Sequence, residues 1–329
     1  MTDISEMAER VRAGDRRALA RAITLVESAR PQDRDAALAL LDAVGADRQA
    51  LRIGLSGTPG VGKSTFIESL GLRLVGAELR IAVLAVDPSS ARSGGSILGD
   101  KTRMEELSRA PGAYIRPSPS QTHLGGVARR TREAIRLCEA AGFDVVLVET
   151  VGVGQSETVV AQMTDLFVLL LAPAGGDELQ GVKRGIMEIA DLILVNKADG
   201  ELRSQAQRTC ADYAGALRLL RKRAGDPEGF PKALTVSAIE AQGLERAWDE
   251  MQALATWRRE TGHWDARRTA QARYWFREEL RAEMMALLTT DPELRARLDA
   301  LEEDVAAGRT SPANAARAAL AALAPIAGA

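Results

Sequence analysis

The chain has 329 residues, and its 43 Lys and Arg nearly balance its 45 Asp and Glu. This length suffices for one sizeable α/β domain with helical additions, and the balanced charge gives no electrostatic reason to expect a nucleic acid or a membrane as the main partner. The two cysteines, Cys138 and Cys210, belong to no C-x-x-C pair, which argues against a disulfide framework and a structural zinc site.

The first residues carry no sign of export. Residues 1–12 alternate acids and bases without the apolar core of a signal peptide. No uninterrupted apolar stretch approaches the roughly 20 residues that a membrane-spanning helix needs. We therefore expect a cytoplasmic protein.

Residues 5–44 have a helical pattern. Leu19, Ile23 and Val26 recur at helix spacing, and after Pro31 a second set does the same. That second set is Leu38, Leu41 and Val44. We predict two amphipathic helices ahead of the main domain.

Apolar runs alternate with helical stretches through the middle of the chain. Several runs are apolar on both faces, as in strands of a parallel sheet that helices cover. The alternation predicts an α/β fold with a doubly wound, mostly parallel sheet, whose ligands bind at the carboxyl ends of the strands. The expected strands are Leu51–Ser56, Arg80–Asp87, Phe143–Glu149, Asp165–Ala172, Asp191–Asn196 and Ala233–Ser237.

The pattern returns to helix from Leu244 onward. Leu244, Trp248, Met251 and Ala255 form one stripe, and a longer helix is expected from about Asp265 to Leu288. Asp291-Pro292 and Ser311-Pro312 each have the form of an N-cap followed by proline at the first helical position. We predict three parts: N-terminal helices (1–48), a central α/β domain (49–260) and a C-terminal helical region (261–329).

A complete phosphate-binding loop follows the first predicted strand. Its glycines let backbone N–H groups turn toward a β-phosphate, and the helix that follows adds its positive N-terminal end. We expect Lys63 to reach the β- and γ-phosphates and the Ser64 hydroxyl to bind Mg²⁺. The predicted nucleotide-binding residues of this segment are Gly57, Thr58, Pro59, Gly60, Val61, Gly62, Lys63, Ser64 and Thr65.

A second motif indicates which base is bound. Asn196-Lys197-Ala198-Asp199 follows the fifth predicted strand, and an aspartate there can accept hydrogen bonds from both N1–H and the 2-amino group of guanine. Adenine has no matching donors and would leave the carboxylate unpaired. Ser237-Ala238 ends the next strand, where a backbone N–H would meet guanine O6. The pair of motifs favours GTP and GDP over adenine nucleotides.

Acidic residues near other strand ends are candidate magnesium ligands. Asp87 and Glu149 end two predicted strands, and Asp100 lies in a glycine-rich loop. With Ser64 these carboxylates exceed the one or two protein ligands that Mg²⁺ usually takes, so some would act through water. Asp100 alone could also be an ordinary solvated loop residue.

Glu149-Thr150-Val151-Gly152 stands where many GTPases have Asp-x-x-Gly, whose glycine N–H senses the γ-phosphate. We name Lys63, Glu149 and Gly152 as catalytic candidates. Val153 follows, and a valine cannot orient the attacking water as a glutamine does, although Gln155 is close. We therefore expect slow intrinsic hydrolysis.

Together these motifs resemble the MeaB/ArgK-type G proteins, a family of metallochaperone-like GTPases that includes the methylmalonic aciduria type A protein. The resemblance spans roughly residues 13–238 and leaves the 201–230 segment unaligned. The stretches that carry it are 57–65, 85–90, 94–104, 115–120, 139–157, 176–181 and 196–199.

The resemblance implies a partner, a B12-dependent acyl-CoA mutase such as methylmalonyl-CoA mutase. Family members gate the loading of adenosylcobalamin and help to expel damaged cofactor, and they are typically homodimers joined through C-terminal helices. The resemblance thus implies that residues 49–260 are a P-loop G domain and that residues 261–329 are a helical dimerisation region. The resemblance also makes the 175–185 loop a third switch that contacts the mutase. Its polar candidates are Asp177, Glu178, Gln180 and Lys183.

Three alternatives remain open. A nickel-insertion GTPase would need clustered soft or imidazole ligands, whereas His123, His263 and the two cysteines are scattered. A small-molecule kinase on the same fold would need an acceptor pocket and usually prefers ATP. An interaction module could hold GDP without turnover, although the intact Lys63 and Ser64 argue against that.

Overall fold

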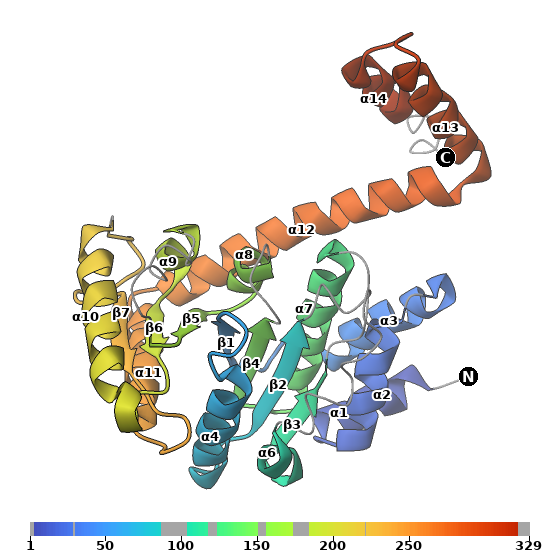
Figure 1. Cartoon of the computed structure of the whole chain (residues 1–329). Coiled ribbons are helices and arrows are strands. Elements are labelled where there is room, and N and C mark those ends of the chain that lie inside the picture. Colours follow the sequence, from blue (N-terminus) through green and yellow to red (C-terminus); the bar gives the residue numbers. More distant parts are fainter. Residues whose placement is uncertain are drawn as a thin grey trace. The chain divides into compact units, whose positions relative to one another are not determined.

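The computed structural model describes residues 3–28, 30–86, 104–117, 124–150, 156–173, 184–220 and 222–321. The chain divides into two compact units, residues 1–268 and 269–329. Figure 1 shows the elements of both.

The N-terminal segment forms three helices where two were predicted. Gly14 has a φ of 78° and ends the first helix, and the Asp15 side chain accepts hydrogen bonds from the backbone N–H groups of Arg17 and Ala18 to begin the second. Leu38, predicted to be on the buried stripe, is 43% exposed. The helices are α1 (Ile4–Arg12), α2 (Arg16–Val26) and α3 (Pro31–Val44).

Seven strands in the described part of the chain form one sheet in the order β3-β2-β4-β1-β5-β6-β7, and every pairing among them is parallel. The predicted doubly wound class is confirmed. Six strands match the predicted runs, and β3 at the edge was not predicted. The strands are β1 (Leu51–Ser56), β2 (Ile81–Val86), β3 (Ala113–Arg116), β4 (Val145–Thr150), β5 (Leu166–Leu171), β6 (Leu192–Val195) and β7 (Lys232–Thr235).

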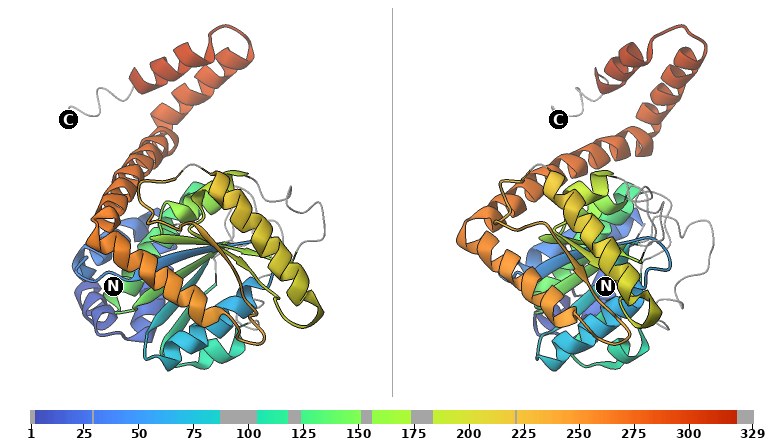
Figure 2. Two further views of the ribbon diagram at one scale, coloured as in Figure 1. Left: turned by 90° about the vertical axis from the view of Figure 1, so that its left-hand side faces the viewer. Right: turned by 60° about the vertical axis from the view of Figure 1, so that its left-hand side comes forward.

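Helices cover both faces of this sheet (Figures 1 and 2). Because strand side chains alternate, Ile53, Val83 and Leu147 point into a core that α4 and α11 complete. The opposite face carries α7 and α8, with α2 and α3 packed outside α7. The remaining elements of this unit are α4 (Lys63–Gly76), α6 (Glu105–Arg109), α7 (Leu124–Ala140), α8 (Ser156–Ala161), α9 (Arg184–Ile189), a 3-10 turn (Gly200–Leu202), α10 (Arg203–Leu219) and α11 (Leu244–Glu260).

An ionic network closes the amino-terminal edge of the sheet. Arg258 of α11 donates to Asp191 (2.6 Å) and to Asp226 (2.8 Å), and Arg223 also donates to Asp191 (2.8 Å). Arg258 and both aspartates are buried. The network joins α11 and the loop before β7 to the start of β6.

The second unit contains the rest of α12 (His263–Thr290), followed by α13 (Pro292–Ala306) and α14 (Pro312–Ala321). Both predicted N-caps are confirmed. Asp291 accepts from the N–H of Leu294 at 3.0 Å, and Ser311 Oγ accepts from the N–H of Asn314 at 3.3 Å. Among the described helices of the whole chain, none combines the length and apolar character needed to cross a bilayer.

Candidate functional site

The loop between β1 and α4 depends on its glycines. A Cβ on Gly57 would lie 2.4 Å from the Leu170 carbonyl oxygen, so no side chain fits there without a backbone shift. Gly60 and Gly62 have φ values of 84° and 88°, which side-chain-bearing residues rarely adopt. The loop ends at the first turn of α4, whose free N–H groups and positive dipole end suit an anion.

Lys63 lies across this loop. Its Nζ donates to the carbonyl oxygens of Gly57 at 2.7 Å and Thr58 at 3.4 Å. The ammonium charge is therefore held at the loop, where an incoming phosphate would meet it. Ser64 follows it half-buried in the same turn, and Thr65 is exposed.

At the carboxyl edge of the sheet, the Asn196 side chain forms hydrogen bonds that connect its own loop with the phosphate loop and with the loop after β7. Its side chain, 1% exposed, donates from Nδ2 to the Val61 carbonyl at 2.9 Å and accepts at Oδ1 from the N–H of Ala238 at 3.0 Å. Lys197 Nζ donates to the Gly60 carbonyl at 2.7 Å. The structure thus brings the predicted phosphate loop, the 196–199 motif and Ser237-Ala238 into one site.

A serine orients the aspartate of this motif. Ser237 Oγ donates to Asp199 Oδ2 and accepts from the N–H of Glu240 at 3.1 Å. The bond engages one carboxylate oxygen and fixes the plane of the group. The half-buried carboxylate is thus preset to accept donors in one orientation.

Sequence reasoning missed the residues that brace the 237–242 turn. Ser69 of α4 donates to the Ala238 carbonyl at 2.6 Å. Ser237 and Gln242 exchange backbone hydrogen bonds of 2.9 and 3.1 Å, and Arg203 donates to Gln242 Oε1 at 2.8 Å. None belongs to a short motif, so only tertiary structure could reveal them.

Glu149 lies one strand away from the phosphate loop. It is 5% exposed and pairs in register with Leu55 of β1, while Thr150 donates to Ser56 Oγ at 2.9 Å. Ser64 and Glu149 offer the hard oxygen donors that Mg²⁺ takes, so the described residues fit that ion. Among the described residues, no three His, Cys, Asp or Glu side chains form a metal-binding group.

Several predicted site residues lie outside the described residues, so the structure says nothing about their positions. Asp87 and Asp100 of the predicted metal set, Gly152 of the catalytic set, and the nearby Val153 and Gln155 fall there. So do the four predicted switch residues. These are Asp177, Glu178, Gln180 and Lys183.

Comparison with known proteins gives a consistent picture. The family model described as methylmalonyl-CoA mutase-associated GTPase MeaB matches residues 19–293. A Caulobacter vibrioides protein named as a GTPase is 51% identical over 315 residues, covering 95% of each chain. The mouse methylmalonic aciduria type A homolog is 48% identical over 92% of this chain and 75% of its own length. A crystal structure titled LAO/AO transport system kinase superposes with a TM-score of 0.76 at 36% identity, covering 98% of this chain and 99% of that one.

Proposed function

The chain belongs to the MeaB family of GTPases, and from this premise we propose that its GTP cycle gates adenosylcobalamin loading onto a B12-dependent acyl-CoA mutase. The same cycle would protect and reactivate the mutase, for which methylmalonyl-CoA mutase is the first candidate. One observation carries the proposal. The chain matches a family described as mutase-associated GTPases, and Asn196 joins its phosphate-binding and base-binding motifs into one site.

The proposed roles are those that the sequence motifs predict, and the position of Lys63 at the phosphate loop supports its part in them. Residues 57–65 would hold the β- and γ-phosphates, with the charge of Lys63 on the γ-phosphate. Ser64 would bind Mg²⁺ directly and Glu149 through water, with Asp87 and Asp100 as further predicted ligands. When bound, Mg²⁺ neutralises charge that develops on the phosphate oxygens. Gly152 N–H remains the predicted γ-phosphate sensor.

Asp199 should determine base choice. We expect Asp199→Asn to weaken GTP about a hundredfold, roughly 3 kcal/mol, and to favour xanthine nucleotides, because the amide supplies a donor for the 2-oxo group. Competition against a fluorescent GDP analogue measures both effects. Asp212→Asn, at an exposed position of α10, should bind like the native protein. Equal affinity of the native protein for ATP and GTP would contradict the assignment.

The mutase should accelerate turnover. With Val153 in place of a water-orienting residue, the isolated protein is expected to hydrolyse GTP slowly, and purified methylmalonyl-CoA mutase should raise the rate at least tenfold. Phosphate release is measured with apo-mutase, with cobalamin-loaded mutase and with an unrelated protein at the same concentration. If neither form of the mutase changes turnover or co-elutes with the protein, the mutase assignment is wrong.

A kinase is the second candidate, because the protein of the superposed crystal structure is named a transport system kinase. The two activities differ in the fate of the γ-phosphate. Hydrolysis releases one inorganic phosphate for each GDP formed, whereas a kinase leaves the phosphate on an acceptor. A stoichiometry of one phosphate per GDP, in the presence of candidate small-molecule acceptors, would exclude the kinase.

We further propose a cytoplasmic homodimer that joins through the C-terminal helices, with the three-part organisation predicted above. The support is that six of the ten exposed large apolar side chains among the described residues lie in the second unit, and water does not favour such exposure. The set comprises Tyr274, Phe276, Leu280, Met285, Leu287 and Leu320.

A further inference from the structure

The 237–242 turn is hydrogen-bonded to the helix that begins at the phosphate loop. Ser69 Oγ donates to the Ala238 carbonyl oxygen at 2.6 Å, and Ser69 lies within the first two turns of α4, which starts at Lys63. Asn196 also holds the turn, because its Oδ1 accepts from the Ala238 N–H at 3.0 Å. Both backbone polar groups of Ala238 are therefore engaged.

The Ser69 bond sets the direction of the peptide group between Ala238 and Ile239. This peptide is trans, and in a planar trans peptide the C=O and the N–H point in opposite directions. Because Ser69 holds the carbonyl toward α4, the Ile239 N–H faces away from that helix. The Ile239 side chain is 80% exposed, so its packing contributes little to this orientation.

The Ile239 N–H is a free donor in this turn. It makes no hydrogen bond to any other atom in the described part of the chain, whereas the Ala238 N–H is used by Asn196. The Ala238 carbonyl has little access to water, since the residue is 3% exposed. Loss of the Ser69 hydroxyl would leave that acceptor without a partner, and we expect the peptide to rotate in response.

We propose that Ser69 is a positioning residue for guanine recognition, because it fixes the 238–239 peptide so that the Ile239 N–H donates to guanine O6. This role rests on the guanine site proposed above, in which Asp199 accepts from N1–H and the 2-amino group. A donor to O6 completes the recognition, because guanine has an acceptor at this position whereas adenine has an amino group, which donates.

The test compares GDP with 6-thio-GDP, in which sulfur, a weaker acceptor, replaces O6. Both compete against a fluorescent GDP analogue for the full chain with Mg²⁺, and the affinity of the analogue is measured for each variant. Ser69→Ala should bind GDP about tenfold more weakly than the native protein does, because the O6 donor is no longer held in place. The affinity for 6-thio-GDP should fall by about threefold or less, because that contact is already weak.

Two further variants separate the hydroxyl from the packing of the side chain. Ser69→Thr keeps the hydroxyl and should bind GDP within about threefold of the native affinity. If Ser69→Ala does not fold, Ser69→Cys should show the same selective loss of GDP by a smaller factor, because a thiol is a weak donor.

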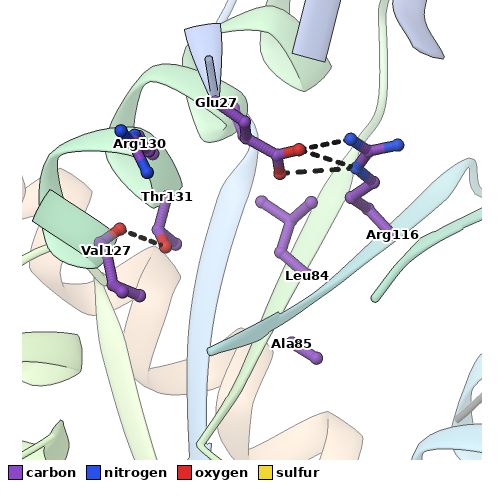
Figure 3. A pocket seen from close by; sticks show the side chains of 8 residues that line it. Glu27, Leu84, Ala85, Arg116, Val127, Arg130 and Thr131 are labelled. Carbon is purple, nitrogen blue, oxygen red and sulfur yellow. Dashed lines mark hydrogen bonds and ion pairs between the residues drawn. The ribbon is translucent and has the colours of Figure 1, made fainter. Parts of the chain in front are cut away.

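Thr131→Val is the matched control. Figure 3 shows the Thr131 hydroxyl donating to the Val127 carbonyl, a bond of 2.8 Å. Like Ser69→Ala, this substitution removes a hydroxyl that donates to a carbonyl. The lost bond lies within α7, on the opposite face of the sheet from α4, so the affinities for GDP and 6-thio-GDP should stay at their native values.

The results distinguish this role from the guanine site itself. Equal losses of GDP and 6-thio-GDP in Ser69→Ala, or a loss that Ser69→Thr does not restore, would show that Ser69 acts on the fold and not on O6. Native GDP affinity in Ser69→Ala, in a protein that prefers GTP to ATP, would refute the role of Ser69 and leave the guanine site standing. A native protein that binds ATP as well as GTP would refute both.

Discussion

Replacing Lys63 by alanine should abolish GTP hydrolysis and weaken GTP more than GDP. The ammonium lies over the phosphate loop through its bonds to Gly57 and Thr58, where its charge can compensate the γ-phosphate, which GDP lacks. Losing one such group from a water-poor site reduces turnover by a factor on the order of 10³. Single-turnover phosphate release and nucleotide titrations measure the two effects.

Lys232→Ala is the matched control for this variant. Lys232 begins β7, at the amino-terminal edge of the sheet, and pairs with Glu250 at 2.6 Å. We expect it to hydrolyse GTP at the native rate. Because Lys63 also bridges the loop without nucleotide, GDP affinity must be measured alongside turnover. Native turnover in Lys63→Ala would show that the loop has been misassigned.

The sheet could be predicted because its central strands are buried on both faces and appear as continuous apolar runs. β3 was missed for a physical reason. It has four residues, ends in Arg116 and pairs with β2 alone, so it needs no long apolar run. The third N-terminal helix was missed because Gly14 interrupts a pattern whose apolar spacing continues on either side.

The candidate site could be predicted as far as its motifs are contiguous. Each motif places its residues next to one another in the chain, and the strand ends bring the motifs together. What holds them together could not be predicted in the same way. Ser69 and Ala238 are 169 positions apart, and the bond from Asn196 to Val61 joins loops from two strands. Such contacts exist only once the sheet order is set.

The ion pairs at the amino-terminal edge of the sheet could not be predicted from the sequence either. Asp165 and Asp191 each begin an apolar run, a position that is typical of a solvated strand end. The structure instead buries both. Their partners Arg268 and Arg258 come from helices far along the chain, so the sequence gives no local sign of the pairing.

Arg258→Met should destabilise the first unit more than any surface substitution. Asp191 accepts at Oδ1 from Arg258 at 2.6 Å and from Arg223 at 2.8 Å, and at Oδ2 from the N–H of Phe167 at 2.8 Å. Removing Arg258 takes away a positive charge that compensates the buried carboxylates of Asp191 and Asp226. We expect the free energy of unfolding to fall by about 3–5 kcal/mol, measured by urea denaturation with GDP absent.

Arg246→Met tests whether the loss is specific to the network. Arg246 lies exposed on the same helix, so its replacement should change the free energy of unfolding by about 0.5 kcal/mol or less. A loss of similar size in the two variants would mean that arginines of α11 stabilise the fold by packing alone.

The pH dependence of the stability difference between the native protein and Arg258→Met separates the loss of the ion pair from a loss of packing. Burial alone would raise the pKa of Asp191, but the charges of Arg258, Arg267 and Arg223 outweigh it and hold that pKa below its ordinary value. A carboxyl with a lowered folded-state pKa stabilises fully above its unfolded value of about 3.9 and loses that contribution as the pH falls through the folded value. The difference between native protein and Arg258→Met should therefore be largest near neutral pH and should shrink as the pH falls below about 4. A difference that stays constant down to the acid limit of folding would show that the methionine disrupts packing and that the pairing with Asp191 contributes little.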